Sequence, residues 1–314
     1  MASSDYVPQL AALVRSPPAG DEWLHEIKFD GYRIGCRIAG GQVRLISRNG
    51  KDWTDAFPAI AGAAARLRTR DALLDGEVVV VLPDGRTSFE ALQQAARGGA
   101  EHAALAYFVF DLLRLDGERL DRLPLETRKV RLRRLLGRTR GRIRYTDHVE
   151  GHGEAFLREA CRLGLEGIVS KRRDLPYHAG RRDSWRKTKC LRRGAFVIGG
   201  YVDSPAAHAG LGALLVGRYD GRRLVYAGRV GTGFSRTVAG ELRATLDALA
   251  RPDAPFHDPP TGAPVRRARW VAPRLVCDVT FSERTSAGLL RQPVFQGLRR
   301  DLRPREVTIG RETR

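Results

Sequence analysis

Short runs of alternating or continuous apolar residues recur along the chain, and they constrain its fold more than any other feature. Such runs predict strands at residues 23–29, 33–38, 42–47, 72–82, 105–115, 166–171 and 184–190. Helical periodicity is confined to residues 55–67, 88–96, 125–136 and 154–163. Because the helices do not alternate strictly with the strands, we expect an α+β fold with mainly antiparallel sheets.

The pattern changes at about residue 193. Four strand-like runs, at 196–202, 211–219, 224–230 and 275–281, accompany one helix-like stretch at 235–249. Several short strands with a single helix are typical of a small OB-fold β-barrel. We therefore expect two domains, residues 1–192 and residues 193–314, with the proline-rich residues 252–264 forming a surface loop in the second.

The charge of the chain points to a polyanionic partner. The 314 residues include 55 Lys and Arg against 36 Asp and Glu, a formal net charge of +19, and both predicted domains are basic. Nucleic acid is the first candidate, because neutralised phosphates release counterions, and a nonspecific basic surface is the alternative. A hydrophobic fraction of 42% excludes a disordered protein.

Two further features bear on location. No apolar run approaches the roughly 18 residues of a membrane-spanning helix, and no secretory signal is visible, so we expect a soluble cytoplasmic protein without a membrane partner. The four cysteines, Cys36, Cys161, Cys190 and Cys277, are scattered and form no CxxC pair. We therefore expect four reduced thiols, with neither a zinc site nor a disulfide.

Lysine is rare in this arginine-rich chain. Only six lysines occur, at positions 28, 51, 129, 171, 187 and 189. Arginine cannot lose its proton, whereas lysine can when burial or nearby cations lower its pKa, so a nucleophilic cation has to be lysine. Lys28, Lys171, Lys187 and Lys189 are therefore candidates for chemistry.

One of them lies in a compact motif, K-x-D-G-x-R, at Lys28, Asp30, Gly31 and Arg33. A strand that ends at Lys28, a turn at Gly31 and a strand from Arg33 would place Lys28 and Asp30 on the same side. A salt-bridged hairpin corner is the alternative interpretation, just as a solvated basic strand is for Lys187 and Lys189.

At this motif the chain resembles the covalent nucleotidyltransferases, and most closely the bacterial ATP-dependent DNA ligases of the ligase D, end-joining type. Further blocks of that family follow in order, at residues 47–50 (SRNG), 75–77 (DGE), 108–113 (FVFDLL), 166–171 (EGIVSK), 184–189 (SWRKTK), 269–273 (RWVAP) and 290–299 (LRQPVFQGLR). The resemblance covers almost the whole chain. It implies DNA repair by a nucleotidyltransferase domain and an OB-fold domain.

The resemblance assigns the nucleotide chemistry. It implies that Lys28 attacks the α-phosphate of ATP to give lysyl-AMP, while Lys187 and Lys189 hold the phosphate oxygens. Glu77 would contact the ribose and, with Glu166, a Mg²⁺ or Mn²⁺ ion. Phe110 would stack on adenine, and Glu26 and Ile27 would present backbone groups to the edge of the base.

It also assigns the DNA steps. Arg33 and Arg48 would hold the ribose and the 5′-phosphate of the nick, Asp30 would serve the later steps, and Lys171 would contact DNA. Pyrophosphate would be oriented by Arg291, Arg299 or Arg303, because the family usually has lysine where Leu302 and Arg303 stand.

The partners implied by the family are nicked or broken duplex DNA, a Ku-like end-binding protein, and polymerase and nuclease modules. We expect a monomer, either free-standing or the ligase part of a larger protein.

Two other functions stay open. An RNA ligase or an mRNA capping nucleotidyltransferase shares the K-x-D-G motif, although the FDLL block and the C-terminal blocks favour a DNA ligase, and a capping enzyme would use GTP. A noncatalytic DNA-binding protein with a decayed site is the third candidate. The presence of all of Lys28, Glu77, Glu166, Lys187 and Lys189 argues against decay.

Overall fold

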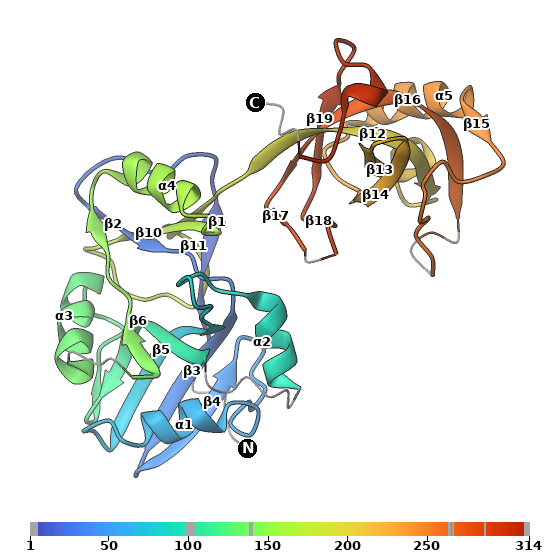
Figure 1. The fold of residues 1–314 in the computed structure, drawn as a ribbon. Coiled ribbons are helices and arrows are strands. Elements are labelled where there is room, and N and C mark those ends of the chain that lie inside the picture. Colours follow the sequence, from blue (N-terminus) through green and yellow to red (C-terminus); the bar gives the residue numbers. More distant parts are fainter. Residues whose placement is uncertain are drawn as a thin grey trace. The chain divides into compact units, whose positions relative to one another are not determined.

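The computed structural model describes residues 6–97, 104–137, 141–262, 265, 267–285 and 287–310. The chain forms two compact units, Met1–Cys190 and Leu191–Arg314 (Figure 1). The first is a mixed α/β unit and the second is a β-rich unit of the OB type, as predicted. The predicted domain boundary between residues 192 and 193 stays a prediction.

A central antiparallel sheet forms the body of the first unit. Its strand order is β4-β3-β5-β6-β7, and β8 pairs with β6 in parallel. The strands are β3 (Tyr32–Ala39), β4 (Gln42–Ser47), β5 (Asp71–Val80), β6 (Leu105–Leu115), β7 (Glu118–Arg119) and β8 (Ile143–Tyr145). The apolar side chains of these strands form a fully buried core with the helices that pack on them, so this sheet is the rigid support of the unit.

A second sheet of the first unit has the strand order β1-β11-β10-β2-β9. Its members are β1 (Gln9–Leu13), β2 (Trp23–Ile27), β9 (Val149–Glu150), β10 (Gly167–Arg172) and β11 (Gly180–Lys189). The sequence did not predict β1, which pairs in parallel with β11. Because β2, β10 and β11 are neighbours, the predicted motifs around Lys28, Glu166 and Lys187 lie side by side.

The described residues of the first unit also form four α-helices: α1 (Pro58–Ala64), α2 (Phe89–Ala96), α3 (Leu125–Leu136) and α4 (Gly153–Arg162). The bounds of α3 agree with the prediction. The predicted helix at 55–67 is shorter in the structure because it begins at Pro58, whose ring suits the first helical position and whose missing N–H costs nothing there. The hydroxyl of Ser88 accepts from Ala91 N at 3.2 Å and caps α2.

The second unit is built on a six-stranded sheet. Five of its strands have the order β14-β13-β12-β16-β15, and the sixth, β19, pairs with β16. Its elements are β12 (Arg192–Asp203), β13 (Leu211–Asp220), β14 (Arg223–Val230), α5 (Arg236–Asp247), β15 (Ala250–Arg251), β16 (Ala268–Phe281), β17 (Glu283–Arg284), β18 (Leu290–Arg291) and β19 (Val294–Leu298). Buried residues of β12, β13, β16 and α5 form its core. Within the predicted loop at 252–264, residues 263 and 264 lie outside the described part.

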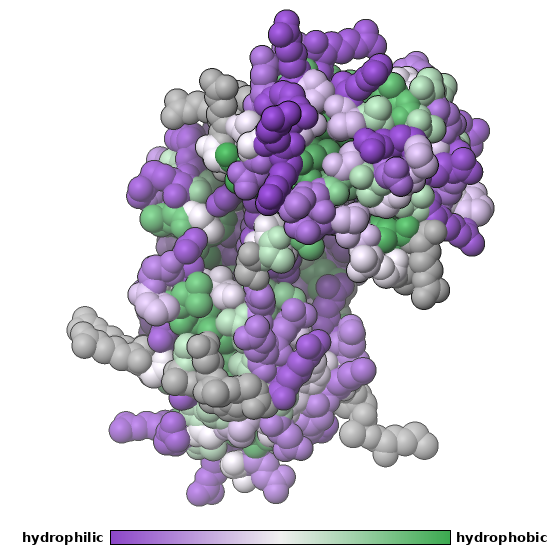
Figure 2. All heavy atoms as spheres, turned by 45° about the vertical axis from the view of Figure 1, so that its right-hand side comes forward, coloured by the Kyte–Doolittle hydropathy of each residue, from purple (hydrophilic) through white to green (hydrophobic). Residues whose placement is uncertain are grey.

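The visible surface is mainly hydrophilic, with hydrophobic residues in small groups (Figure 2). Among the described residues, no helix is long and apolar enough to cross a membrane.

The expectation of four reduced thiols is wrong. Cys161 and Cys190 form a disulfide with a Cα–Cα distance of 5.2 Å, while Cys36 and Cys277 are free and buried. The fold explains the pairing, because the backbone N–H of Cys190 donates to the carbonyl of Glu166 at 2.9 Å, just beyond the end of α4. The sequence separation of 29 residues between the two cysteines gives no hint of this proximity.

Candidate active site around Lys28

Lys28 follows the last residue of β2, and the sheet fixes its backbone. Its N–H donates to the carbonyl of Gly167 at 2.9 Å, which ties the lysine to the start of β10. Its Nζ forms an ion pair with Glu166, the residue before β10. Lys189 Nζ lies 3.3 Å from the other oxygen of Glu166, so one carboxylate contacts two ammonium groups. Three residues from separate sequence motifs therefore meet at one point.

The positions of Lys187 and Lys189 follow from the strand register. Val169 of β10 is paired with Lys187 and Gly167 with Lys189, so both lysines lie on the face of the sheet that bears Glu26 and Lys28. Burial lowers the pKa of Lys187, and the nearby charges of Lys28 and Lys189 lower it further. The cluster therefore produces a strong positive field at this end of the sheet.

Glu26 is buried between two lysines. Its carboxylate pairs with Lys129 from α3 and, at 2.5 Å, with Lys171 from β10, and all three side chains are only 2% exposed. Burial raises the pKa of Glu26, but the two lysines outweigh burial and hold the pKa below its usual value. Burial also lowers the pKa of Lys171 to about 8. Lys171 is therefore held inside the protein by Glu26, and its predicted contact with DNA stays a prediction.

Arg33 is held by a carboxylate in the central sheet. Its Nε and Nη2 donate to the two oxygens of Asp75, each at 2.6 Å. Asp75 is fully buried and also accepts from the hydroxyls of Tyr6 at 2.6 Å and Tyr177 at 2.7 Å. Because a bidentate pair leaves the guanidinium little freedom, Asp75 and the two tyrosines fix the direction of Arg33.

Phe110 lies beneath these cations. The guanidinium of Arg33 is 4.3 Å and the Nζ of Lys171 is 4.0 Å from the centre of its ring, and Trp185 meets it edge-on with ring centres 6.0 Å apart. Cations on an aromatic ring are stabilised by its quadrupole. The ring of Phe110, which was predicted to stack on adenine, is 7% exposed. It is already in contact with two charged side chains.

A cationic cavity of about 180 Å³ opens in front of this cluster. It is lined by charged residues from both sheets, namely Glu26, Lys28, Arg33, Arg48, Glu77, Lys171, Arg181 and Lys187. Within it, burial raises the pKa of Glu77 to about 7, although Arg33 and Lys28 favour the carboxylate. The cavity thus combines an excess of cations with one carboxyl group that titrates near neutral pH.

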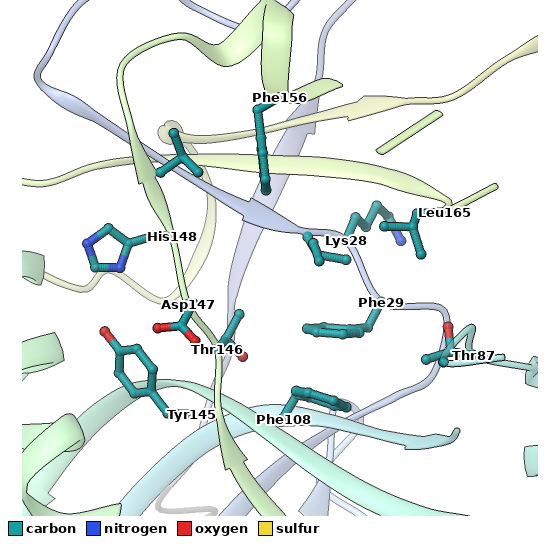
Figure 3. Close-up of a pocket in the computed structure, with 13 residues that line it drawn as sticks. Lys28, Phe29, Thr87, Phe108, Tyr145, Thr146, Asp147, His148, Phe156 and Leu165 are labelled. Carbon is teal, nitrogen blue, oxygen red and sulfur yellow. The ribbon is translucent and has the colours of Figure 1, made fainter. Parts of the chain in front are cut away.

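A second, more apolar cavity of about 330 Å³ also includes Lys28. Phe29 and Phe108 stack in it, with ring centres 4.2 Å apart. Figure 3 shows Lys28 above this aromatic pair and His148 to its left, with Tyr145, Thr146 and Asp147 between His148 and the pair. We call it the aromatic cavity. Lys28 therefore lies where an aromatic cavity and a cationic cavity meet.

The backbone of Ile27 faces the aromatic cavity. Lys28 N donates toward β10, and the carbonyl of Trp23 accepts from Gly151 N on the opposite edge. Because strand residues alternate between the two edges, Ile27 turns its N–H and carbonyl away from β10, as Trp23 does. The neighbouring strand β9 pairs with Leu24 and His25 only, so it ends before Ile27.

The remaining predicted residues lie in two places. Asp30 follows Lys28 in the loop between β2 and β3 and is half-buried. The three arginine candidates belong to the second unit: Arg291 pairs with Glu283 at 2.6 Å, Arg299 with Asp301 at 2.7 Å, and Arg303 precedes a short 3-10 helix, Pro304–Glu306.

Several residues of the site were missed by the sequence reasoning. Lys129 could have been found by the argument from lysine rarity, since it too lies at the site. Asp75 could have been found from the DGE motif, because it is the first residue of that motif. Phe29, Thr146 and His148 gave no signal, because their proximity to Lys28 depends on how distant segments pack.

Comparisons with known proteins identify the family of both units. Residues 8–189 match the model of the "ATP dependent DNA ligase domain", and residues 207–302 match that of the "ATP dependent DNA ligase C terminal region". The multifunctional non-homologous end joining protein LigD of Pseudomonas aeruginosa is 42% identical over 96% of this chain and 36% of its own length. The LigD protein of Mycolicibacterium smegmatis is 35% identical over 91% of this chain and 37% of its own length. The chain spans little more than a third of these relatives.

Solved structures agree. A mycobacterial DNA ligase D complexed with ATP and MES is 32% identical, covers 98% of this chain and 99% of its own, and has a TM-score of 0.57. The ligase domain of LigD from M. tuberculosis is 33% identical and has a TM-score of 0.57. The match covers 98% of this chain and 100% of that structure's chain. A Lig E DNA ligase, 20% identical with 94% and 99% covered and a TM-score of 0.60, shares the fold.

Proposed function

This chain belongs to the ATP-dependent DNA ligases and is a ligase domain of the LigD type, and we propose that Lys28 is its nucleophile. In this proposal the Lys28 amine takes AMP from ATP and releases pyrophosphate. The AMP then passes to a DNA 5′-phosphate, and the 3′-hydroxyl attacks that phosphate to close the strand and release AMP.

The position of Lys28 between the two cavities supports this proposal most directly. The aromatic cavity fits a purine base, and the cationic cavity fits the phosphates. A nucleotide that occupied both would bring its α-phosphate to Lys28. A hairpin corner or a solvated basic strand, the alternatives left open by the sequence, would not require two cavities that meet at this residue.

The charged groups beside Lys28 fit the first step. The amine attacks phosphorus only after it loses a proton, and the carboxylate of Glu166, in contact with Nζ, is placed to accept it. Lys187 and Lys189 would stabilise the negative charge that builds up on the α-phosphate oxygens. Arg33 and Arg48 would act on the ribose and on phosphate groups in the cationic cavity.

We assign the stacking of adenine to the Phe29–Phe108 pair instead of Phe110. The ring of Phe110 is in contact with Arg33 and Lys171, whereas Phe108 lines the aromatic cavity. The predicted backbone contact of Ile27 with the base agrees with this placement, because its polar groups face the same cavity. Glu26 would then act by holding Lys129 and Lys171 instead of touching the base.

A divalent cation fits Glu77 and Glu166. Among the described residues no group of three or more acidic, histidine or cysteine side chains forms a complete metal site. Two carboxylates are nevertheless what Mg²⁺ needs when phosphates and water supply its other ligands. Bound there, the ion would neutralise charge on the phosphates.

We propose end joining as the setting, with nicked or broken duplex DNA as substrate. The relatives named for non-homologous end joining support this, and so does the net charge of +19. A Ku-like protein and polymerase and nuclease modules would be partners. Asp30 would serve the DNA steps, and one of Arg291, Arg299 and Arg303 would orient pyrophosphate. We place the domain boundary at residues 192/193 and expect a monomer.

Nick sealing tests the proposed function. A duplex with one 5′-phosphorylated nick is incubated with the chain, Mg²⁺ or Mn²⁺, and either ATP or GTP. We expect joined DNA with ATP, little with GTP, and none with Lys28→Ala. A nicked RNA duplex joined faster than DNA would favour an RNA ligase, and transfer of GMP without joining would favour a capping-type enzyme. DNA binding with no reaction of any nucleotide would leave a noncatalytic protein.

A further inference from the structure

The disulfide between Cys161 and Cys190 lies at the surface of the first unit. Cys161, in the last turn of α4, is exposed, and Cys190, which directly follows β11, is half-buried. The free thiols of Cys36 and Cys277 are both buried. A thiolate in solution can reach an exposed disulfide, and exposed disulfides are more labile than buried structural ones. This bond is therefore open to thiol–disulfide exchange.

The two cysteines flank the carboxylate that contacts the proposed nucleophile. Only residues 162–165 separate Cys161 from Glu166 along the chain. On the other side, Cys190 donates its N–H to the carbonyl of Glu166 at 2.9 Å. Cys190 also follows Lys189, whose Nζ lies 3.3 Å from the Glu166 carboxylate. The disulfide thus encloses the backbone of a residue that acts at the site.

The loop that leads to Glu166 is a cap on the end of α4. The N–H of Leu165 donates to the carbonyl of Ala160 at 3.0 Å, and that of Gly164 donates to the carbonyl of Cys161 at 3.1 Å. Gly164 has a φ of +74°, the left-handed conformation that favours glycine in such caps. These bonds tie the loop to α4, so whatever holds the end of α4 also holds Glu166. The disulfide is the covalent link from that end to β11.

The same part of the unit forms one wall of the aromatic cavity. Phe156 from α4 and Leu165 from the loop both line it. Figure 3 shows these two residues and Lys28 above the Phe29–Phe108 pair. A shift of the end of α4 would therefore reach both the carboxylate beside Lys28 and the wall of the cavity in which we place the base.

The sheet does not need the disulfide to stay together. Backbone pairing joins β10 to β11 from Gly167 opposite Lys189 to Lys171 opposite Trp185, and β10 also pairs with β2. Loss of the disulfide would free the end of α4 and its loop, while the strands that bear the lysines stay in register. Reduction should therefore displace Glu166 without unfolding the unit.

We propose that the Cys161–Cys190 disulfide is a site of thiol–disulfide exchange, through which reducing dithiols slow the formation of lysyl-AMP. With the link broken, the end of α4 no longer fixes the loop, and Glu166 spends less time in contact with Lys28. The oxidised chain is the faster form. The inference rests on the proposed function, because the reaction of Lys28 is the step that the disulfide controls.

The exchange balances with a dithiol as the reductant. One thiolate of the dithiol attacks Sγ of the exposed Cys161, the protein S–S bond breaks, and Cys190 leaves as a thiolate. The second thiolate of the dithiol then attacks its own sulfur in the mixed disulfide and expels the Cys161 thiolate. The two protons that the dithiol gave up end on the two cysteines. The dithiol is oxidised to a cyclic disulfide, and the protein gains two thiols.

Single-turnover formation of lysyl-AMP tests the proposal. The oxidised chain and the chain reduced with dithiothreitol receive saturating ATP and Mg²⁺ at a temperature at which circular dichroism shows both folded, and AMP addition is followed by intact mass. We expect reduction to slow the addition about fivefold or more, and reoxidation to restore the rate. Equal rates, with two new thiols confirmed by alkylation, would overturn the proposal. So would a disulfide that dithiothreitol does not reduce in the folded chain.

Two variants serve as controls. Cys161→Ser/Cys190→Ser should add AMP at the rate of the reduced wild type and should not respond to dithiothreitol. Cys277→Ala removes a buried free thiol instead and should respond as the wild type does. If the double serine variant were also slowed by the reductant, the effect would arise elsewhere and the proposal would be wrong.

Hydrogen exchange separates a local effect from a general loss of stability. After reduction, the amides of residues 163–167 should exchange faster, while those of the central sheet keep their protection. Exchange that is unchanged at the loop, or that rises equally throughout the first unit, would contradict the proposal.

The two levels of the account fail in different ways. If the oxidised and reduced chains gain AMP equally fast, the control by the disulfide is wrong while the ligase function stands. If neither chain gains AMP although exchange at the loop changes as expected, the disulfide holds the loop as inferred and the proposed chemistry fails.

Discussion

At the scale of single residues, the account depends on charges held at short range inside the first unit. Glu26, Lys129 and Lys171 form a buried group with one negative and two positive charges. Breaking a buried ion pair leaves an uncompensated charge, which costs far more than the pair contributes when it is intact.

We therefore expect Glu26→Gln to lower the free energy of unfolding by about 3 kcal/mol or more. Urea denaturation followed by circular dichroism would measure the loss. The matched control is Glu159→Gln on α4, which removes the same charge from an exposed pair with Arg162 and should leave the unfolding midpoint unchanged. Equal effects of the two substitutions would mean that the buried group does not stabilise the fold.

Glu77 gives a pH dependence with a definite sign. Its pKa of about 7 means that the carboxyl is largely neutral below pH 7 and ionised above it. A metal or ribose contact that needs the carboxylate is then lost as the pH falls through 7. We expect the affinity for Mg²⁺–ATP in the Lys28→Ala background to rise with pH across this range, and Glu77→Gln to remove the rise. An identical pH profile in the Glu77→Gln variant would exclude Glu77 as the titrating group.

At the scale of elements, the sequence predicted best what local pattern determines. The long apolar run of β6 and the amphipathic α3 have the predicted bounds, because burial on one or both faces dictates their composition. Strand β1 was missed because its sequence, QLAAL, lacks β-branched residues, and it is a strand only through its pairing with β11.

The residues of the site also divide into those that a local sequence pattern predicted and those that it did not. Lys28, Glu166 and the β11 lysines were predictable because short motifs contain them. The aromatic cavity was not, since Phe29 lies in the loop after β2 whereas Thr146 and His148 lie in the loop between β8 and β9, and these loops meet only through packing. The roles of Lys171 and Phe110 stay predictions for a related reason. The resemblance supplied a role for each, but burial and neighbouring charges decide whether a side chain is accessible.

The disulfide between α4 and the end of β11 should stabilise the first unit. Closing a loop of 29 residues restricts the unfolded chain, an effect worth about 3 kcal/mol. Reduction by dithiothreitol should therefore lower the midpoint of thermal unfolding of the wild-type chain. The Cys161→Ser/Cys190→Ser variant should unfold near the temperature of the reduced wild type and should not respond to the reductant. If reductant lowers both midpoints equally, the stabilisation has another origin.

At the scale of the whole molecule, both units are basic, and we expect them to bind DNA mainly through phosphates. Such binding weakens steeply with salt, by about a thousandfold between 50 and 200 mM for roughly six phosphate contacts, and is indifferent to base sequence. Fluorescence anisotropy with two nicked duplexes of unrelated sequence would measure both properties. Affinity that hardly changes with salt, or that differs strongly between the duplexes, would contradict the electrostatic account.

Intact mass spectrometry of the Lys28 variants tests the central claim most directly. The wild-type chain is treated with ATP and Mg²⁺, its mass is measured, and nicked DNA is then added. We expect one added AMP that disappears when the DNA is sealed, and no addition to Lys28→Ala or Lys28→Arg, since arginine cannot supply a neutral amine.

Lys51→Arg, which makes the same change at a lysine outside the motifs and outside the two cavities, should gain and lose AMP as the wild type does. Joining of pre-adenylylated nicks by Lys28→Ala should persist at least in part, because that step follows the attack by lysine. AMP on the Lys28→Arg chain, or adduct on the wild type that nicked DNA does not remove, would contradict the account.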